Sequence, residues 1–372
     1  MRICYVLLSP TFGMHQYTAD LANRMASAGH DVHLVTSVRY PRDRYLSAVT
    51  VHTPVDTRNT GFSRDALRIS GVRDTQAEIG ALFPDLVHFT GPHVWNVSLL
   101  WLLRQANIPS VHTLHDLDPH SGTSYGRLLH LWNRRIIDQT DHLLVHGARY
   151  REQLLSKGVQ WERVTFTPLL HLFLGEAWLE GADYLTSRVR YEPWALFFGR
   201  MEHYKGVDYL ITASAMLNGP SGNGPRLVLA GPGKLDRLWA GSLPPQIEVR
   251  NRLIDDDEAM DLFRRCGLLV LPYLDATQSA LIPAAYYFRK PVVVTWTGAL
   301  PEYVQEGQTG WLVEPDHPPS LARCLDSALT DPARLAEMGA AGRAWYDGRR
   351  TVEQQVLEDM YERLVDEGTH DN

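Results

Sequence analysis

The chain has 372 residues, of which 44% are hydrophobic and 21% are charged, and its formal net charge is −7 at pH 7. This length predicts two domains of ordinary size, and the negative balance excludes a generic nucleic-acid-binding protein, which would need a basic surface. The first apolar run, residues 3–8, is too short for a signal peptide or a membrane span, so we expect a cytoplasmic protein.

The N-terminal half alternates short apolar runs with segments of helical periodicity, which predicts βαβ units around a parallel sheet. We expect this part, residues 1–172, to form one Rossmann-like domain. The predicted strands cover residues 3–8, 32–36, 86–89, 110–114 and 143–145, and the predicted helices cover residues 17–28, 94–105 and 128–137.

The C-terminal half repeats this layout, which predicts a second Rossmann-like domain over residues 190–350. Its predicted strands cover residues 195–199, 227–230, 247–250, 268–271 and 292–295, with a helix over 207–216. The fold class is therefore α/β, with two doubly wound domains facing a cleft where the carboxyl ends of the strands bind ligands. An amphipathic helix at 352–365, within the segment 351–367, is open to packing back on the first domain.

The first candidate site is the turn Ser9 to Met14, between the first strand and the first helix. Gly13 can adopt a positive φ there and let a ligand approach the backbone. One glycine, where a dinucleotide fingerprint carries three, argues against a nicotinamide site. A plain strand-to-helix turn explains the glycine equally well.

The second candidate site follows the strand that ends at Gly199. Arg200 and Lys205 lie five residues apart, and Gly206 opens the next helix. A guanidinium binds two phosphate oxygens with its planar fork, and an ammonium adds a compact charge near a helix N-terminus. The pair is suited to a diphosphate leaving group, although a solvated surface turn also places Arg and Lys in such positions.

The third candidate site is the polar loop after the strand at 268–271. The free amides at the start of the following helix can bind anionic oxygens or sugar hydroxyls, whereas helix capping alone is the simpler alternative. The candidate residues of this loop are Asp275, Thr277, Gln278, Ser279, Ala280 and Leu281.

Histidines are concentrated in the N-terminal half. His115 lies where a strand meets its loop and is followed by Asp116, which favours hydrogen bonding or acid–base chemistry, whereas His112 inside the strand is expected to be structural. The spacing of His112, His115 and His120 matches no metal-binding motif, and Asp116 with Asp118 is a weak metal-binding pattern, so we expect no bound metal.

Taken in order, five strand-end segments resemble those of the retaining family 4 glycosyltransferases of GT-B fold, and the resemblance covers nearly the whole chain. The N-terminal segment Thr113-Leu114-His115-Asp116 is similar to the histidine segment of that family. The five segments are Leu196–Gly206, Leu229-Ala230-Gly231, Leu271–Ser279, Lys290–Glu302 and Thr309–Val313.

The resemblance implies a role for each candidate residue. Arg200 and Lys205 would neutralise the diphosphate, and His115 would contact the transferred sugar. Gly13 would let the backbone reach the phosphate and sugar, Leu253 would lie near the base, and Gly199 would belong to the donor-binding loops with the amides of Gln278 to Leu281. Fixed cations and helix termini would replace a metal ion in stabilising the leaving group.

The chain departs from the family where two glutamates normally stand eight positions apart, because these positions hold Ala276 and Ala284. A methyl group cannot accept a hydrogen bond from the ribose, and Asp275 is a substitute only for the first glutamate. Two alternatives therefore stay open, a nucleotide-sugar epimerase and a non-catalytic nucleotide-sugar-binding protein.

The expected function is a retaining transfer of a sugar from a UDP- or GDP-linked donor to a small-molecule natural product or glycan acceptor. The N-terminal half offers no polybasic patch, so contact with a membrane surface is not favoured.

Overall fold

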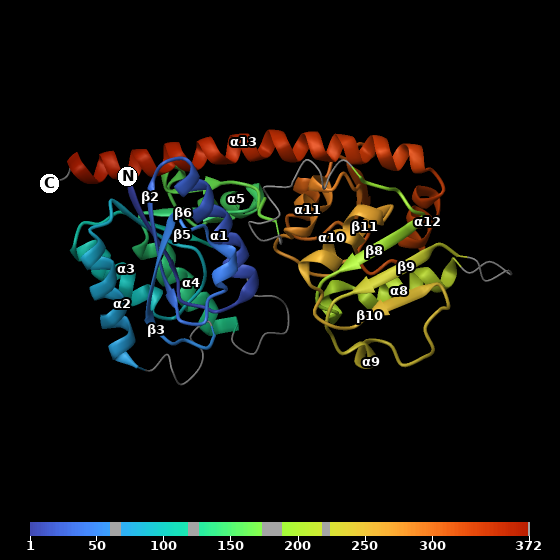
Figure 1. Cartoon of the computed structure of the whole chain (residues 1–372), viewed down its shortest axis with the longest axis horizontal. Coiled ribbons are helices and arrows are strands. Elements are labelled where there is room, and N and C mark those ends of the chain that lie inside the picture. The colour runs from blue at the N-terminus through green and yellow to red at the C-terminus, as the bar shows by residue number, and fades with distance from the viewer. Residues whose placement is uncertain (60–67, 118–125, 173–187, 218–223, 371–372) are drawn as a thin grey trace. The chain divides into compact units, whose positions relative to one another are not determined.

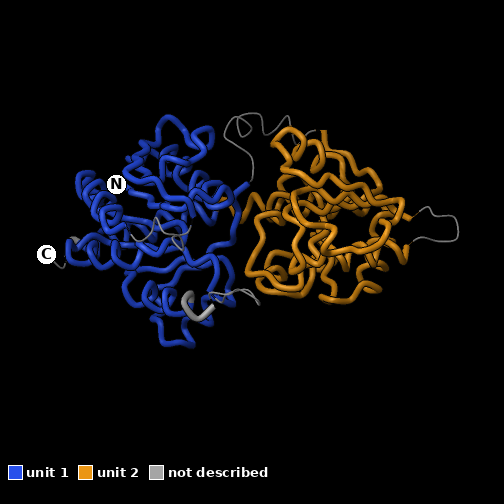
Figure 2. The backbone as a smooth tube through the Cα atoms, turned by 90° about the horizontal axis from the view of Figure 1, so that it is seen from below, with its two compact units in different colours: residues 1–177, 352–372 blue, residues 178–351 orange. Residues whose placement is uncertain are grey.

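The computed structural model describes residues 1–59, 68–117, 126–172, 188–217 and 224–370. The chain forms two compact units, shown in Figure 2: unit 1 contains Met1–Ala177 and Val352–Asn372, and unit 2 contains Trp178–Thr351. Each unit contains one parallel sheet with helices around it (Figure 1), so the predicted α/β class is confirmed.

Unit 1 is built on a seven-stranded sheet in the order β3-β2-β1-β4-β5-β6-β7. All its strand pairs are parallel. The strands are β1 (Arg2–Leu7), β2 (Asp31–Ser37), β3 (Val49–Val55), β4 (Leu86–Phe89), β5 (Ser110–Thr113), β6 (His142–Val145) and β7 (Val164–Phe166).

The strand order of unit 1 reverses between β1 and β4, so the right-handed crossovers on the two sides of this reversal put helices on both faces of the sheet. Its helices are α1 (Phe12–Ser27), α2 (Ile69–Leu82), α3 (Asn96–Gln105), α4 (Gly126–Gln139) and α5 (Ala148–Ser156), with short 3-10 turns at Arg42–Arg44 and Trp161–Arg163.

Unit 2 is built on a six-stranded parallel sheet in the order β10-β9-β8-β11-β12-β13, and its order reverses between β8 and β11. The strands are β8 (Trp194–Phe198), β9 (Arg226–Ala230), β10 (Ile247–Arg250), β11 (Leu268–Leu271), β12 (Val292–Thr295) and β13 (Gly310–Val313). The helices are α8 (Val207–Met216), α9 (Leu235–Leu238), α10 (Asp256–Arg265), α11 (Leu281–Tyr287) and α12 (Pro318–Leu329), with 3-10 turns at His203–Lys205 and Leu300–Tyr303.

The last helix, α13 (Pro332–His370), contributes its first part to unit 2 and its last part to unit 1. In unit 2, Arg343 Nη1 donates to the carbonyl of Tyr287 at 3.0 Å. In unit 1, Arg24 pairs with Glu353 at 3.2 Å. The predicted helix at 352–365 was therefore too short. Over the described residues, no helix is long and apolar enough to cross a bilayer.

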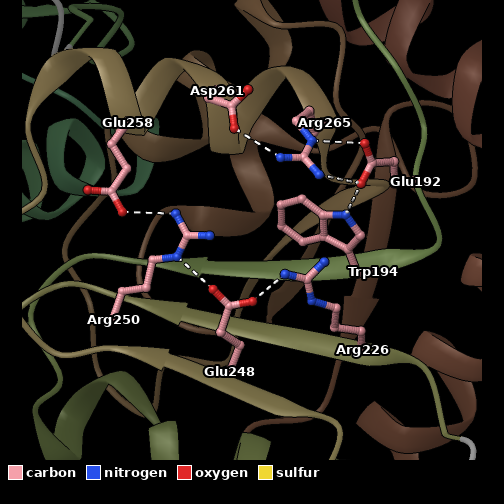
Figure 3. A network of polar contacts seen from close by, with 8 residues as sticks. All are labelled: Glu192, Trp194, Arg226, Glu248, Arg250, Glu258, Asp261 and Arg265. Carbon is pink, nitrogen blue, oxygen red and sulfur yellow. Dashed lines mark hydrogen bonds and ion pairs between the residues drawn. The ribbon is translucent and has the colours of Figure 1, made fainter.

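Charged side chains surround the outer strands of unit 2 (Figure 3). Glu248 on the edge strand β10 pairs with Arg226 of β9 and with Arg250, which pairs in turn with Glu258 of α10 at 2.8 Å. A charged edge strand resists pairing with a second chain. We regard this network as structural, because no candidate donor-binding residue belongs to it.

Candidate active site

The candidate loops of unit 2 lie where its strand order reverses. Gly199 and Arg200 follow β8, and the segment 272–280 follows β11, so both leave the carboxyl ends of neighbouring strands. Ligands of doubly wound sheets bind outside this edge, at the reversal. The backbone joins the two loops directly, because the amide of Leu274 donates to the carbonyl of Tyr204 at 2.7 Å.

Three candidate residues of unit 2 meet at one point. A Cβ atom built on Gly199 would lie 3.1 Å from Lys205 Nζ and 3.9 Å from Leu281 Cδ1. Gly199 itself has a φ of +119°, which side-chain-bearing residues rarely adopt. The ammonium therefore lies against bare backbone at the carboxyl end of β8.

The charge of Lys205 is not balanced by a carboxylate among the described residues. Its Nζ lies 5.1 Å from the ring centroid of Tyr273 and 5.9 Å from that of Tyr204, and the side chain is half-buried. Burial raises the pKa of the Tyr204 hydroxyl, and the charges of Lys205 and Arg200 oppose that rise. A half-buried cation without a counter-charge favours an anionic ligand.

Arg200 is placed differently from Lys205. Its guanidinium pairs with Glu202 at 3.0 Å, and 65% of its side chain is exposed. The two predicted phosphate-binding cations therefore lie on one loop and differ in exposure, because Lys205 is half-buried beside Gly199 and Arg200 is mostly exposed.

Two further glycines shape this edge of the sheet. At Gly206, with φ +65°, a Cβ would lie 1.9 Å from the carbonyl oxygen of Pro272. At Gly298, with φ +52°, a Cβ would lie 1.5 Å from the carbonyl oxygen of Ala276. Both glycines allow backbone contacts across the site that any other residue would block.

The loop before α11 is held mainly by its backbone. The carbonyl of Thr277 accepts from the amide of Ala299 at 3.0 Å, and Ser279 Oγ accepts from the amide of Leu281 at 3.3 Å. Ala280 is the N-cap of α11, and Gln278 Oε1 is buried without a hydrogen-bond partner among the described residues. The amide of Asp275 lies 3.4 Å from the carbonyl of Tyr204.

The remaining unit 2 candidates divide into exposed and buried positions. Leu253, three residues beyond β10, is 80% exposed, so its side chain is available to a ligand. Ala276 and Ala284 are both buried, and neither supplies a hydrogen-bond acceptor.

In unit 1, the expected turn before the first helix is shorter than predicted. Helix α1 begins at Phe12 with Thr11 as its N-cap, five residues before the predicted start. Gly13 is therefore helical, and the expectation of a positive φ was wrong. Apart from its chain neighbours and its own helix backbone, no described atom lies within 4 Å of a Cβ built on Gly13, so the space beside it at the helix N-terminus is open.

His115 is held as a neutral hydrogen-bond donor just beyond β5. Its Nε2 donates to the carbonyl of Thr90 at 2.9 Å, and the side chain is 7% exposed. Burial lowers the pKa of His115, while the bond to Thr90 and the charge of Asp116 oppose the change. A neutral ring whose Nε2 carries the proton leaves Nδ1 as an acceptor.

Other histidines have structural partners. His112 donates from Nδ1 to the carbonyl of Thr113 at 2.9 Å, and its Nε2 lies 3.0 Å from Asn96 Nδ2, which confirms the structural prediction for His112. Burial lowers the pKa of His112 to about 3. His120 and Asp118 lie outside the described residues. Among the residues that the structure describes, no three His, Cys, Asp or Glu side chains are arranged to hold a metal ion.

The sequence did not reveal which side chains surround His115. The ring of Tyr17 lies edge-on to His115 at a centroid distance of 4.9 Å, and it also contacts His146 at 5.1 Å and His171 at 5.7 Å. The concentration of histidines was the available signal, but these residues come from four separate segments of the chain.

Two family domains match this chain in the same order as its two units. A glycosyl transferase 4-like domain matches residues 12–169, and a domain of the glycosyl transferases group 1 matches residues 192–331. A D-inositol 3-phosphate glycosyltransferase from Streptomyces avermitilis is 33% identical over 381 residues, covering 88% of this chain and 78% of that protein. A protein of the same name from Corynebacterium glutamicum is 24% identical, covering 88% of this chain and 85% of its own length.

Solved structures share the architecture at low sequence identity. Sucrose-phosphate synthase from Thermosynechococcus elongatus matches with a TM-score of 0.74 and 19% identity, covering 98% of this chain and 99% of its own. HepE from Anabaena in complex with UDP matches with a TM-score of 0.72 and 16% identity, covering 97% and 100%. Since the two family domains follow one another on two parallel sheets of this architecture, the chain belongs to the family 4 type of glycosyltransferases and has the GT-B fold.

Proposed function

We propose that this glycosyltransferase moves a sugar, with retention of anomeric configuration, from a UDP- or GDP-linked donor to a small-molecule natural product or glycan acceptor. The observation that carries the proposal is the Lys205 ammonium beside Gly199 at the strand reversal of unit 2, which has no carboxylate partner in the part of the chain that the structure describes. HepE, solved with UDP-glucose, supports a UDP-linked donor. Relatives named for inositol 3-phosphate make a phosphorylated polyol a useful member of any acceptor panel.

In this proposal, Lys205 and Arg200 stabilise the charge that develops on the departing diphosphate. Arg200 is free to do so by exchanging its exposed partner Glu202 for phosphate oxygens, since surface ion pairs contribute little to stability. Leu253 lies near the base, and the loop from Asp275 to Leu281 holds the donor through its amides. The positive charges of the protein take the place of a metal ion.

His115 contacts the transferred sugar in this proposal, and Gly13 leaves room for it at the start of α1. A neutral imidazole can accept a hydrogen bond from a sugar hydroxyl at Nδ1 while Nε2 keeps its hydrogen bond to the carbonyl of Thr90. The ring therefore orients the sugar without carrying charge, and the stabilisation of charge is left to unit 2.

The test is to replace both cations, in Arg200→Ala with Lys205→Ala, and to measure transfer from UDP- and GDP-sugars. Loss of two charged groups at the leaving diphosphate should lower kcat/KM by roughly a thousandfold, while the melting temperature stays close to that of the unmodified chain. Arg323→Ala, at an exposed position on α12, is the control and should keep full activity. Near-normal transfer by the double variant would contradict the assignment, and isomerised donor in the absence of acceptor would indicate an epimerase.

A further inference from the structure

A chain of buried hydrogen bonds connects the C-terminal helix to α1 within unit 1. The Tyr361 hydroxyl on α13 lies 2.6 Å from His88 Nδ1, and His88 Nε2 lies 2.8 Å from Thr113 Oγ1. Thr113 Oγ1 lies 3.1 Å from the Tyr17 hydroxyl. Three links therefore join segments that are 344 residues apart in sequence, the difference between positions 361 and 17.

The side chains of Tyr361, His88, Thr113 and Tyr17, which form this series of hydrogen bonds, are all buried, and each has a hydrogen-bond partner. Burial lowers the pKa of His88 well below its usual value, so its ring is neutral and offers one donor and one acceptor. Each hydroxyl likewise has one proton to donate, so all three links can run in the same direction along the chain. A fully paired buried network favours a single arrangement of its members, because any alternative leaves a polar group unsatisfied.

The chain ends on the aromatic ring that supports His115. The Tyr17 ring meets the His115 ring edge-on, with an interplanar angle of 88°, and it meets His146 at 79°. The hydroxyl of Tyr17 is fixed by Thr113, and its ring is only 3% exposed. His115 is tied at Nε2 by the carbonyl of Thr90, and its ring packs against Tyr17 and, at a centroid distance of 5.3 Å, against His146, so Tyr17 is one of the two rings that set its tilt.

We infer that Tyr361 is a positioning residue for His115: through His88 and Thr113 it fixes the ring of Tyr17, and Tyr17 fixes the plane of the His115 imidazole. The inference rests on the proposed role of His115 at the transferred sugar. The C-terminal part of α13 would then contribute to catalysis as well as packing against unit 1.

Tyr5 provides a matched control for Tyr361. Its hydroxyl lies 3.3 Å from that of Tyr361, and both side chains are fully buried. Tyr5 is a side branch, because none of the three links to Tyr17 passes through it. The Tyr361 hydroxyl has two partners, His88 and Tyr5, so a purely structural role predicts a larger loss of melting temperature in Tyr361→Phe than in Tyr5→Phe without a change in kcat, whereas positioning predicts a fall in kcat in Tyr361→Phe alone.

The first test is kinetic and uses the full chain. Tyr361→Phe should lower kcat roughly fivefold to tenfold with an unchanged KM for the donor, because the bound sugar meets a misoriented ring. Tyr17→Phe should have a similar effect, and the double variant should be no worse than either single one. Tyr5→Phe should keep the unmodified kcat. If Tyr361→Phe does not fold, Thr113→Val breaks the same chain and should give the same result.

The second test does not need transfer activity. The ring nitrogen resonances of His115, assigned by their loss in His115→Gln, should shift in Tyr361→Phe and stay in place in Tyr5→Phe. If the unmodified chain transfers no sugar, the proposed function fails while this comparison still tests the positioning. Unchanged kcat and unchanged His115 resonances in Tyr361→Phe would overturn the inference, whatever the loss of melting temperature.

Discussion

The two candidate regions of this chain use opposite kinds of polar group. Unit 1 surrounds His115 with buried, neutral imidazoles that are fixed by hydrogen bonds and ring contacts. Unit 2 presents cations on a loop, one half-buried and the other mostly exposed. Neutral groups that are fixed in place suit the recognition of sugar hydroxyls, whereas cations suit a diphosphate.

This difference indicates which change in conditions or sequence should destabilise each unit. A buried neutral histidine makes the free energy of unfolding depend on pH, because at low pH the histidine is protonated in the unfolded chain and stays neutral in the folded one. The ordered loops of unit 2 depend instead on glycine backbones. Three predictions can break or sharpen this contrast.

The largest expected effect is that unit 1 loses stability before unit 2 as the pH falls. Burial lowers the folded-state pKa of a set of unit 1 histidines, in two cases to about 3: His88, His112, His142 and His146. Below their ordinary value of 6.5 the unfolded chain binds more protons, so each histidine makes folding less favourable by up to about 2 kcal/mol between pH 6.5 and 5. Hydrogen exchange, corrected for its intrinsic rate, should show lower protection in β4 to β6 than in β11 and β12 at pH 5.

His142→Gln is the control variant for this acid effect. His142 Nε2 lies 2.8 Å from Thr165 Oγ1, and the glutamine amide can keep a hydrogen bond there without binding a proton. The decline of stability with pH should become shallower by about 2 kcal/mol over the same interval. Equal loss of protection in both sheets across that interval would contradict the contrast between the units.

The second prediction compares two glycines. Gly13→Ala places its methyl group in open space on a helical backbone, so the free energy of unfolding should stay within about 1 kcal/mol of its value while kcat/KM falls roughly tenfold or more. Gly206→Ala forces a methyl group onto the carbonyl of Pro272 and should lower the free energy of unfolding by about 2–3 kcal/mol together with activity.

Chemical denaturation and donor kinetics on the two variants would check this pair. If Gly13→Ala retains full activity, the N-terminus of α1 does not approach the donor. If Gly206→Ala is as stable as the unmodified chain, the loop at the strand reversal tolerates a different backbone conformation, and the expected clash with the carbonyl of Pro272 does not decide its stability.

Most of the fold was predictable from the sequence, because buried parallel strands are continuous apolar runs. The predicted strands 268–271 and 292–295 are such runs and match β11 and β12 residue for residue, and the alternating segment 247–250 matches the partly exposed edge strand β10. The early start of α1 was missed because Phe12-Gly13 resembles a turn, and glycine is a weak helix former. The length of α13 was missed for a related reason, since Gly339 and Gly342 interrupt the helical pattern of its first half.

Those glycines of α13 have a packing role that only the folded chain reveals. A Cβ on Gly339 would lie 1.9 Å from the carbonyl oxygen of Arg289, and one on Gly342 would lie 2.5 Å from the ring of Tyr286. By contrast, the order of the strand-end loops along the sequence predicted that Gly199, Lys205 and Leu281 would belong to one site. No local pattern predicts that Tyr361 lies against His88, because that contact depends on how a distant helix packs.

The smallest expected effect sharpens the acid contrast from the side of unit 2. Glu192 accepts two hydrogen bonds from Arg265, at 2.9 and 3.1 Å, and one from Trp194 Nε1 at 3.0 Å (Figure 3). These partners hold the pKa of Glu192 below its ordinary value. A carboxylate with a lowered folded-state pKa stabilises the fold above its ordinary pKa of about 4.5, and this stabilisation is lost as the pH falls through the folded-state value.

Glu192→Gln should therefore lower the free energy of unfolding by about 1 kcal/mol at pH 7, a modest value because 40% of the Arg265 side chain is exposed. The difference from the unmodified chain should shrink below pH 4.5 and remain constant between pH 7 and 5, where the histidines of unit 1 titrate. Glu337→Gln, which removes an exposed pair with Arg334 on α13, should change stability by less than about 0.5 kcal/mol. A Glu192→Gln difference that already declines at pH 6 would mean that carboxylates, and not only histidines, set the acid limit of this fold.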